Sequence, residues 1–594
     1  MKRRPLILAT KGLITSGHYL ATAAGYRVAL MGGNAIDIAA TVCFCLNLVE
    51  NQNCGLGGEV PALIYSAKEK KTFAVSGLGW NASAFTIDWC REHGLDMIPG
   101  DGFLPALVPS VVGTWGAAVE RFGRLSFAQI LHPIIELAEQ GYPVYEGLFR
   151  VLTHQKEKFT KRYPTTGKLF LPEGRVPQIG ERMTNPDLAN TLKIMVKAES
   201  EQSNKGRSAG IQAAVNAFYQ GPIAEQIVRF IQDHSVEDDS GQSHTGLLSY
   251  SDIAGWQARI EEPLSFIYEG LVVNKCNSWT QGPVFLQQLA ILSGFDLKHM
   301  GLNSVDYIHT ILESSKLAFA DREAYYGDPL FDKPPFDVLL SPIYNEQRRR
   351  LITSQASMTL QPGDAGGGLP AFDINDVRGS NRLGLGFDAP QGSSGLPGHA
   401  GDTTHLDVVD AEGNMVAATP SGGWIPSSPV IAGLGFPLGT RGQMFYLDPE
   451  RPNALAPHKR PRATLTPSLV TRNGEPLLAF GMRGGDVQDQ KTLQLFLAHV
   501  EFGLDVQAAL DVPSFHSESF PSSFTPRHVT PGLVVIEDRL DEKVIEGLQK
   551  RGHIVRLNAD VRENMMAVRL DPDTKVMSGG VCSSGEHAYA LGWS

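Results

Sequence analysis

The chain has 594 residues, of which 42% are hydrophobic and 19% are charged, a composition typical of a soluble globular protein with a large core. Its length suggests roughly two to four domains. The formal net charge of −11 provides no basic field for a polyanion, which argues against nucleic acid and anionic membrane surfaces as partners.

The N-terminus and the cysteines indicate where the protein functions. An apolar run after the basic residues 1–4 is interrupted by Lys11, so we expect no signal peptide and a cytoplasmic protein. The most apolar stretch, 38–48, is too short to span a bilayer. Six cysteines in so long a chain predict free, mostly buried thiols. Without a His-Glu-x-x-His or Cys-x-x-Cys motif, nothing in the sequence indicates a structural or catalytic metal, and a scattered carboxylate site for a hard cation stays open. Glycine pairs such as Gly57-Gly58 lack the strand-helix setting of a dinucleotide fingerprint, so no cofactor is predicted.

The N-terminal part of the chain is predicted to be mostly helical. Residues 17–48 have the apolar spacing of a long helix, which Gly32-Gly33-Asn34 should interrupt. A glycine turn at 55–58 and a strand at 61–65 follow. An amphipathic helix with Ile308, Leu312 and Phe319 on one side is expected at the end of this part. The helices predicted by apolar spacing after the strand cover 111–122, 127–141 and 304–326.

A change in composition separates this part from a β-rich one. From about 355 to 401, Gly, Pro, Asp and Ser dominate and apolar periodicity is lost, which predicts a mobile segment. Short strands are then predicted at 406–409, 415–419, 468–471 and 477–481, with a turn at 410–414. A flexible tether therefore ends where the first strand of a β-rich unit begins.

The sequence Asp402-Thr403-Thr404-His405 lies at this junction. A threonine hydroxyl is a poor nucleophile unless a base lies beside it. A cut between Asp402 and Thr403 would give Thr403 a free α-amine, whose reference pKa of about 7.7–8.0 lets it accept the hydroxyl proton near neutral pH. Thr403 would then be nucleophile and base in one residue.

Short motifs occur in a characteristic order along nearly the whole chain. They are Gly32-Gly33-Asn34-Ala35-x-Asp37, Gly55-x-Gly57-Gly58, Pro109-Ser110-Val111-Val112-Gly113, His309-x-x-x-Glu313, Phe319-Ala320-Asp321-Arg322, Gly327-Asp328-Pro329, Thr403-Thr404-His405, Lys459-Arg460-Pro461, Thr466-Pro467-Ser468 and Gly484-Gly485. Together they resemble the γ-glutamyltranspeptidase family of N-terminal-nucleophile hydrolases.

The resemblance implies an α+β fold, an αββα four-layer sandwich formed by two chains from one precursor. The large subunit would comprise residues 1–402, with a mobile tail at about 355–402. The small catalytic subunit would comprise residues 403–594, and the two would together make one fold. No metal or cofactor is implied.

The resemblance also implies roles for individual residues. Gly484 and Gly485 match paired glycines whose N–H groups hold the oxyanion, and glycine suits this because it lets the backbone approach the substrate. Thr404 and Ser421 match hydroxyl positions that support the nucleophile. His405 is expected to be structural, and Asp402 would either assist precursor cleavage or be idle.

The chain departs from the family where typical members hold a glutamyl group. Residues 78–82 read Leu-Gly-Trp-Asn-Ala in place of an Arg-Glu-x-Ala-Pro-like turn, and residues 462–464 read Arg-Ala-Thr in place of a segment with a Ser-Ser pair. Of the groups that hold the α-amine, only Gln443 remains. Losing these partners would leave the charges of a zwitterion poorly compensated, so free γ-glutamyl compounds are not expected to be the best substrates.

The replacements suggest a pocket with more aromatic surface, as in the family's divergent branch of oxamate amidohydrolases and cephalosporin-type acylases. Arg462 or Arg483 could clamp a carboxylate from a new direction, although a surface position is the commoner explanation for either. The predicted substrate-binding residues are Gln443, Arg462, Thr464, Gly423, Trp424 and Tyr446.

Three functions are consistent with the sequence. The leading prediction is an autoprocessing amidohydrolase that cleaves a small acyl amide through an acyl-enzyme ester. The nearer alternative is a γ-glutamyl transferase or hydrolase acting on glutathione. The third is an uncleaved, non-catalytic binding protein of the same fold. The expected partners are a small-molecule amide, the two chains with each other, and a possible further copy of the processed heterodimer.

Overall fold

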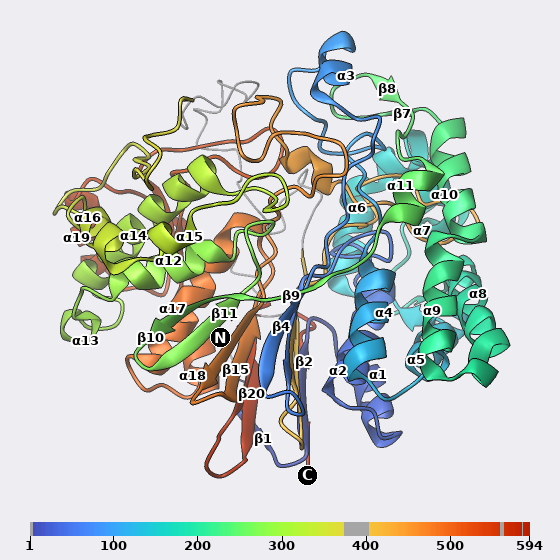
Figure 1. Cartoon of the computed structure of the whole chain (residues 1–594), viewed down its shortest axis with the longest axis horizontal. Helices are drawn as coiled ribbons and strands as arrows, with labels where there is room; N and C mark the ends of the chain where they lie inside the picture. Colours follow the sequence, from blue (N-terminus) through green and yellow to red (C-terminus); the bar gives the residue numbers. More distant parts are fainter. Residues whose placement is uncertain (1–3, 373–402, 559–563, 585) are drawn as a thin grey trace.

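The computed structural model describes residues 4–372, 403–558, 564–584 and 586–594. Asp402 and most of the segment predicted to be mobile lie outside this range. Two seven-stranded sheets lie face to face at the centre of the described part, and helices cover their outer faces (Figure 1). Within each sheet all neighbouring strands pair antiparallel.

Each sheet draws its strands from distant parts of the sequence. In spatial order, sheet 1 contains β1 (Ile7–Ala9), β20 (Met577–Val581), β19 (Met566–Leu570), β15 (Glu475–Gly481), β14 (Ser468–Arg472), β11 (Leu271–Lys275) and β10 (Leu264–Tyr268). Sheet 2 contains β21 (Tyr589–Trp593), β2 (Gly12–Ser16), β12 (Leu406–Asp410), β13 (Met415–Ala418), β3 (Ala62–Ser66), β4 (Lys71–Val75) and β9 (Ile260–Glu261).

The helices form the two outer layers. The layer on sheet 2 is built on α1 (Tyr19–Leu30) and α2 (Ala35–Val49), outside which pack α4 (Val111–Phe122), α5 (Phe127–Gln140), α8 (Pro186–Gln202) and α9 (Arg207–Tyr219). The layer on sheet 1 contains α12 (Pro283–Leu292), α14 (Val305–Tyr325), α17 (Gln488–Val500) and α18 (Val506–Leu510).

The interruption predicted within the first long helix has a local cause. Gly32 adopts a positive φ of 89°, which a glycine accepts without strain, and it follows the last turn of α1. Asn34 then caps α2: its side chain accepts from the N–H groups of Ile36 and Asp37, and Asp37 accepts from the Asn34 N–H. Local chemistry therefore divides one apolar run into two helices.

The segments before and after residue 403 are interleaved in both sheets. Strand β12 pairs with β2 on one side and with β13 on the other, so Val408 lies between Ile14 and Val416. Strand β13 pairs in turn with β3. The hairpin that follows Thr403 is therefore enclosed by strands from the N-terminal part of the chain.

The helix predicted at 304–326 is present, but the prediction that only one side of it is buried is wrong. Ser304 caps α14 and the helix occupies nearly the predicted range, but its side chains from Tyr307 to Ala324 are all buried. Helices α12 and α19 (Glu542–Lys550) and strand β16 (Phe515–Ser517) pack around it. Some of its polar residues have partners on other segments, such as His309 with His553 and Asp321 with Tyr344, which the sequence spacing does not reveal.

The six cysteines are free and buried, as predicted. Among the described residues, no helix combines the length and the apolar character needed to cross a bilayer.

Close approach of β15 to β12 makes Gly481 a test of the sheet packing. A methyl group at position 481 would lie 2.3 Å from Cε1 of His405. We expect Gly481→Ala to lower the free energy of unfolding by about 1–3 kcal/mol, the usual cost of overpacking a core. Gly367→Ala is the matched control, because nothing lies within 4 Å of its new methyl group. Denaturant unfolding of the two variants measures the difference, and equal stabilities would contradict this packing.

Candidate active site

Thr403 lies directly before the central strand β12 and is buried. It forms an antiparallel bridge with Ser421, and the Thr403 Oγ1 and Ser421 Oγ atoms are 3.1 Å apart. The Thr404 N–H donates to the Pro420 carbonyl at 3.0 Å. The structure thus brings together the predicted nucleophile and the predicted supporting Ser421, and it holds their backbones in register.

A buried ion pair supports Ser421 from the other side. Arg441 donates through Nη2 to Ser421 Oγ at 2.6 Å and through Nε to Glu59 Oε1 at 2.6 Å. Glu59 also exchanges two backbone hydrogen bonds with Ser421, both 2.9 Å long. A guanidinium can only donate, so the Ser421 hydroxyl accepts from Arg441 and can donate its own proton to Thr403 Oγ1.

Burial disfavours the ionised form of Glu59. It raises the pKa of the Glu59 carboxyl, and the neighbouring Arg441 opposes that rise. Both side chains are almost fully enclosed. Removing the two charges from water is therefore unfavourable, and the attraction between the closely paired groups offsets this desolvation penalty.

The glycine turn at 55–58 packs against the segment that carries Ser421. A methyl group at Gly58 would lie 2.2 Å from the Ser421 carbonyl oxygen, and one at Gly55 would lie 2.0 Å from the Gly423 carbonyl oxygen. Gly422 and Gly423 have positive φ angles of 66° and 60°. Residues without side chains are thus required on both sides of this contact.

Gly484 and Gly485 follow the end of β15 and precede α17. Their φ angles are 130° and 56°, and Gly485 opens a short 3-10 helix, η4 (Gly485–Val487). Within the described chain, their N–H groups have no recorded hydrogen-bond acceptor. The packing of Gly481 against His405 places the end of β15 beside the start of β12. The two glycines therefore follow the end of a strand that packs against His405, two residues after Thr403.

His405 is fully buried, as its expected structural role requires. Its two ring nitrogens lie 2.9 Å from Thr419 Oγ1 and 2.9 Å from Asp407 Oδ1. Thr15 on β2 donates to the other oxygen of Asp407 at 3.1 Å. His405 thus ties β12 to its neighbours. The predicted supporting hydroxyl of Thr404 is also fully buried, and its Oγ1 has no hydrogen-bond partner in the described structure.

The side chains of two predicted substrate-binding residues are engaged with the protein. The Gln443 amide donates to the carbonyls of Gly100 and Thr440, both at 3.1 Å, and accepts from the Thr525 N–H at 3.1 Å. Tyr446 donates its hydroxyl to Glu323 Oε2 at 2.6 Å. In this structure both groups stabilise the surrounding loops.

The remaining predicted binding residues are also enclosed. The two arginines considered as carboxylate clamps do not occupy the commoner surface position: Arg462 is 1% exposed and Arg483 is 5% exposed. Arg462 pairs with Glu323 at 2.9 Å, and among the described residues its Nε and Nη2 atoms have no hydrogen-bond partner. Thr464 and Trp424 are buried too, and the Arg441 guanidinium lies 5.4 Å from a Trp424 ring centroid.

The sequence analysis did not identify Glu59, Arg441, Glu323 or Asp486 as members of the site. For Glu59 and Asp486 the only local signal is an ionisable residue between glycine and valine, as in Gly58-Glu59-Val60 and Gly485-Asp486-Val487. Charges in such runs require partners when they are buried. The partners lie far away in sequence, so the signal does not name them.

The described structure contains one cluster with metal-ligand chemistry, formed by His309, Glu313 and His553. Lys316 donates to Glu313 Oε1 at 2.7 Å, so a cation already neutralises the only anionic group. The rings of His309 and His553 contact each other through Nδ1 and Nε2 at 2.9 Å. These contacts account for the cluster as a hydrogen-bonded link between α14 and the segment after α19.

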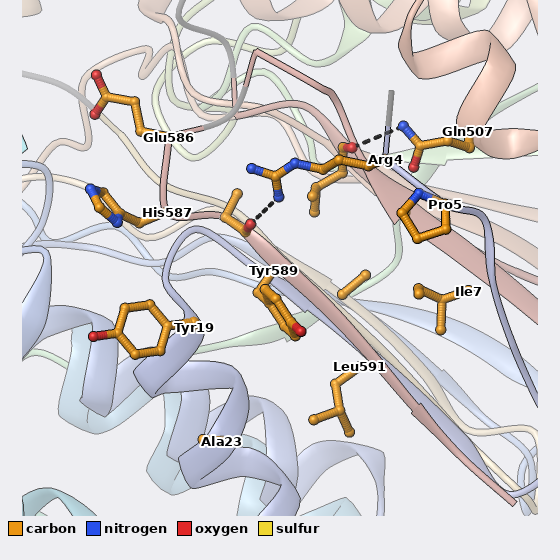
Figure 2. Close-up of a pocket in the computed structure, with 14 residues that line it drawn as sticks. Arg4, Pro5, Ile7, Tyr19, Ala23, Gln507, Glu586, His587, Tyr589 and Leu591 are labelled. Carbon is orange, nitrogen blue, oxygen red and sulfur yellow. Dashed lines mark hydrogen bonds between the residues drawn. The ribbon is translucent and has the colours of Figure 1, made fainter. Parts of the chain in front are cut away.

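A separate pocket of about 680 Å³ lies along the edge strands β1 and β21 and along β20, the neighbour of β1 (Figure 2). Tyr19, Tyr589 and Leu591 line its apolar part, and Arg4 reaches across it to donate to the Ala588 carbonyl. It shares no lining residue with the surroundings of Thr403 described above.

Comparison with known proteins identifies the family. The sequence model described as gamma-glutamyltranspeptidase matches residues 21–590. The chain belongs to the γ-glutamyltranspeptidase family. It is 30% identical over 590 residues to the "Glutathione hydrolase-like YwrD proenzyme" of Bacillus subtilis, covering 98% of both sequences.

Solved structures agree with this assignment. The chain superposes on a structure named LmbA2991HD with a TM-score of 0.92 at 40% identity, covering 100% of both chains. It superposes on a cephalosporin acylase from Bacillus halodurans with a TM-score of 0.83 at 27% identity, covering 100% of this chain and 98% of that one. The predicted αββα fold is confirmed, and the chain is an enzyme of the hydrolase and acyltransferase type, which disfavours the non-catalytic alternative.

Removing Arg441 tests whether it neutralises Glu59. An ionised buried carboxylate without a partner typically costs about 3–5 kcal/mol, so we expect Arg441→Met to lose about that much stability near pH 7. Burial holds the folded-state pKa of Glu59 above its ordinary value, so protonation relieves the cost as the pH falls through this pKa. Urea unfolding of both proteins at pH 7 and pH 5 should show a smaller difference at pH 5.

The double variant Glu59→Gln/Arg441→Met is the control, because it has no carboxylate to protonate. The difference in unfolding free energy between this double variant and Glu59→Gln should be the same at pH 7 and pH 5. A loss in Arg441→Met that stays constant from pH 7 to pH 5 would show that the Glu59 charge is not its cause.

Proposed function

We propose that the chain is made as a precursor that cleaves itself between Asp402 and Thr403, and that Thr403 then hydrolyses a small acyl amide. The observation that carries the proposal is the 3.1 Å contact between Thr403 Oγ1 and Ser421 Oγ at the head of β12. A hydroxyl held there by a second hydroxyl and a buried ion pair is oriented for attack. The family assignment and the word proenzyme in the name of the B. subtilis relative support self-cleavage.

The proposed reaction uses the residues of the small chain directly. In the precursor, Thr403 Oγ1 attacks the Asp402 carbonyl, the peptide C–N bond breaks and leaves the Thr403 nitrogen as a free amine, and water then hydrolyses the resulting ester. In the mature enzyme, the freed α-amine accepts the hydroxyl proton as Thr403 attacks the substrate amide. That proton passes to the departing amine, and water releases the acyl group from the ester.

Gly484 and Gly485 are the proposed oxyanion donors. Their N–H groups have no recorded acceptor in the described chain, and their positive φ angles exclude most side chains from the turn. Donors already oriented toward a developing negative charge stabilise the tetrahedral intermediate without further rearrangement. Thr404 supports the nucleophile in this proposal, together with Ser421.

The proposed substrate is an acyl amide other than a free γ-glutamyl compound. The turn at 78–82, where the family's carboxylate-binding arginine would lie, contacts the following motif: the Asn81 N–H donates to the Lys459 carbonyl at 2.9 Å. The nearest arginine of that motif, Arg460, pairs with Asp328 and Glu261. The charges of a free γ-glutamyl zwitterion would therefore have few oppositely charged partners here. The similarity to a cephalosporin acylase supports an acylase activity.

A γ-glutamyl hydrolase acting on glutathione is the second candidate. The name of the B. subtilis relative favours it, because that protein is described as glutathione hydrolase-like. Retention of Gln443, which matches a residue that typical members use for the α-amine, is consistent with it. For either activity, residues 1–402 and 403–594 would stay together as one processed heterodimer, because their strands share both sheets. A cytoplasmic location is part of the proposal, supported by the six free thiols.

Replacing the nucleophile tests self-cleavage. We expect denaturing mass spectrometry of the purified protein to show two fragments that divide at residue 403, and Thr403→Ala to remain one intact chain without activity. Thr403→Ser is the matched control, because it keeps the hydroxyl and should still be cleaved. A single intact chain in fully active wild-type material would overturn the proposal.

A substrate panel distinguishes the two activities. We expect faster release from oxamate or a glutaryl amide than from a γ-glutamyl anilide, because no arginine occupies the family's usual carboxylate position. Comparison of kcat/KM for the three compounds gives the answer. Turnover of the γ-glutamyl anilide alone would favour the glutathione hydrolase alternative.

A further inference from the structure

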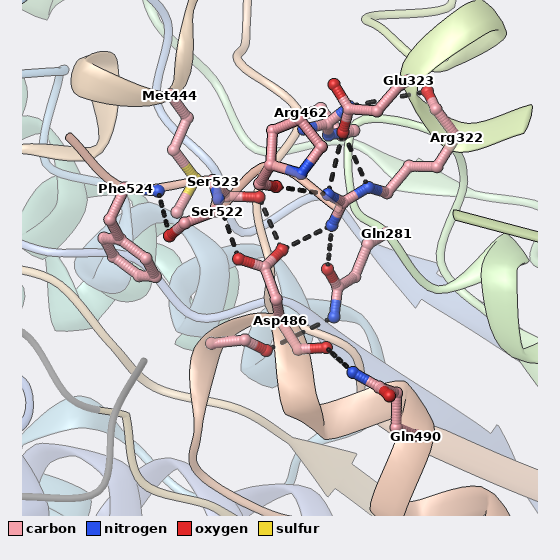
Figure 3. Close-up of polar contacts among 12 residues, drawn as sticks. Gln281, Arg322, Glu323, Met444, Arg462, Asp486, Gln490, Ser522, Ser523 and Phe524 are labelled. Atoms are coloured by element: carbon pink, nitrogen blue, oxygen red, sulfur yellow. Dashed lines mark hydrogen bonds and ion pairs between the residues drawn. The ribbon is translucent and has the colours of Figure 1, made fainter. Parts of the chain in front are cut away.

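Buried side chains form a hydrogen-bonded ring that includes the backbone of Gly485 and Asp486 (Figure 3). Arg322 donates through Nη1 to Gln281 Oε1 at 2.8 Å and to Asp486 Oδ1 at 2.5 Å. Gln281 donates through Nε2 to the Gly485 carbonyl at 3.3 Å. Because Asp486 directly follows Gly485, these three contacts close a ring through the backbone of the turn.

Asp486 and Arg322, two members of the ring, are fixed by further contacts. Asp486 accepts from the Ser523 N–H at 2.8 Å and from the Ser523 hydroxyl at 2.7 Å. Arg322 donates through Nε and Nη2 to Glu323 Oε1, at 3.1 and 2.8 Å, and lies 4.5 Å from the centroid of the Phe319 ring. Gln281, Arg322 and Glu323 are nearly inaccessible to solvent, so these bonds are not weakened by exchange with water.

The turn needs such restraints because glycine supplies none of its own. Two successive glycines leave φ and ψ free, and an oxyanion donor must be oriented before the charge develops. The Gln281 contact fixes the peptide after Gly485, and the Asp486 carboxylate fixes the next residue. Gln281 and Arg322 precede residue 403, whereas the turn follows it.

We propose that Gln281, Arg322 and Asp486 are positioning residues that hold the N–H groups of Gly484 and Gly485 in the orientation that binds the oxyanion. The large chain thereby sets the oxyanion geometry of the small chain after cleavage. This inference rests on the proposed function, because it assigns a role to residues around the same turn.

The test compares Gln281→Ala, Gln281→Glu and Asp486→Asn with the wild type, using processed material only. Loss of one oxyanion donor lowers kcat by about 10²–10³-fold, so a misplaced donor should lower kcat by about 10–100-fold. KM should stay within about threefold, because the contacts act on the transition state. Affinity for a boronate analogue of the substrate, which forms a tetrahedral adduct with Thr403, should fall by the same factor as kcat.

The three variants act on different bonds of the ring. Gln281→Glu can still accept from Arg322 but cannot donate to the Gly485 carbonyl, so it should resemble Gln281→Ala. Gln288→Ala is the matched control: this buried amide on α12 donates to the Asp489 carbonyl at 3.0 Å and has no recorded contact with the turn. Its kcat should stay near that of the wild type.

Unchanged kcat in both Gln281 variants and in Asp486→Asn, with Thr403→Ala inactive, would overturn the inference and leave the proposed function standing. An equal loss in Gln288→Ala would also overturn it, because general packing would then explain the effect. Activity retained in Thr403→Ala would instead overturn the proposed function.

Discussion

The hydrogen bonding of β12 to β2 on one side and to β13 on the other is the constraint on which the rest of the structure depends. It places Thr403 at the head of a central strand, where the backbone is held in two directions. A chain end formed at this point would not leave the sheet, because the strands on both sides still hold it. The same pairing explains why the segments before and after residue 403 make one core.

Close backbone contacts bring the proposed site together around that strand. Gly55 and Gly58 let their turn approach the carbonyls that flank Ser421, and Gly481 makes room for His405 between the sheets. Each contact excludes a Cβ atom, so glycine occupies these positions for steric reasons as well as conformational ones. The surroundings of Thr403 therefore have little freedom to rearrange.

Buried charges make up the second part of the site. Arg441 with Glu59, and Arg322 with Glu323 and Asp486, are paired at hydrogen-bonding distance with almost no exposure. Burial opposes the ionisation of Glu323, yet Arg462 and Arg322 lower the pKa of its carboxyl to about 2. Such pairs often add little net stability, and their better-supported use is to fix one arrangement among several. Here they orient the Ser421 hydroxyl and the glycine turn.

The sequence by itself determined the local elements and singled out Thr403 as the proposed nucleophile. The capping sequence at Asn34, the bounds of α4 and α5, and Thr403 at the end of a glycine-rich segment all depend on residues close together in the chain. The motif order likewise predicted the αββα fold. These features could be predicted because propensity, capping and turn chemistry act over a few residues.

Only the tertiary structure decided which distant groups meet. Arg441 reaches Glu59 across 382 positions, and Arg322 reaches Asp486 across 164. Such pairs leave no periodic signal, because sheet pairing between remote segments sets their separation. For the same reason the sequence predicted an amphipathic α14, whereas packing from several sides buried the helix all round. The sequence therefore pointed to the proposed nucleophile, and the three-dimensional packing determined what surrounds it.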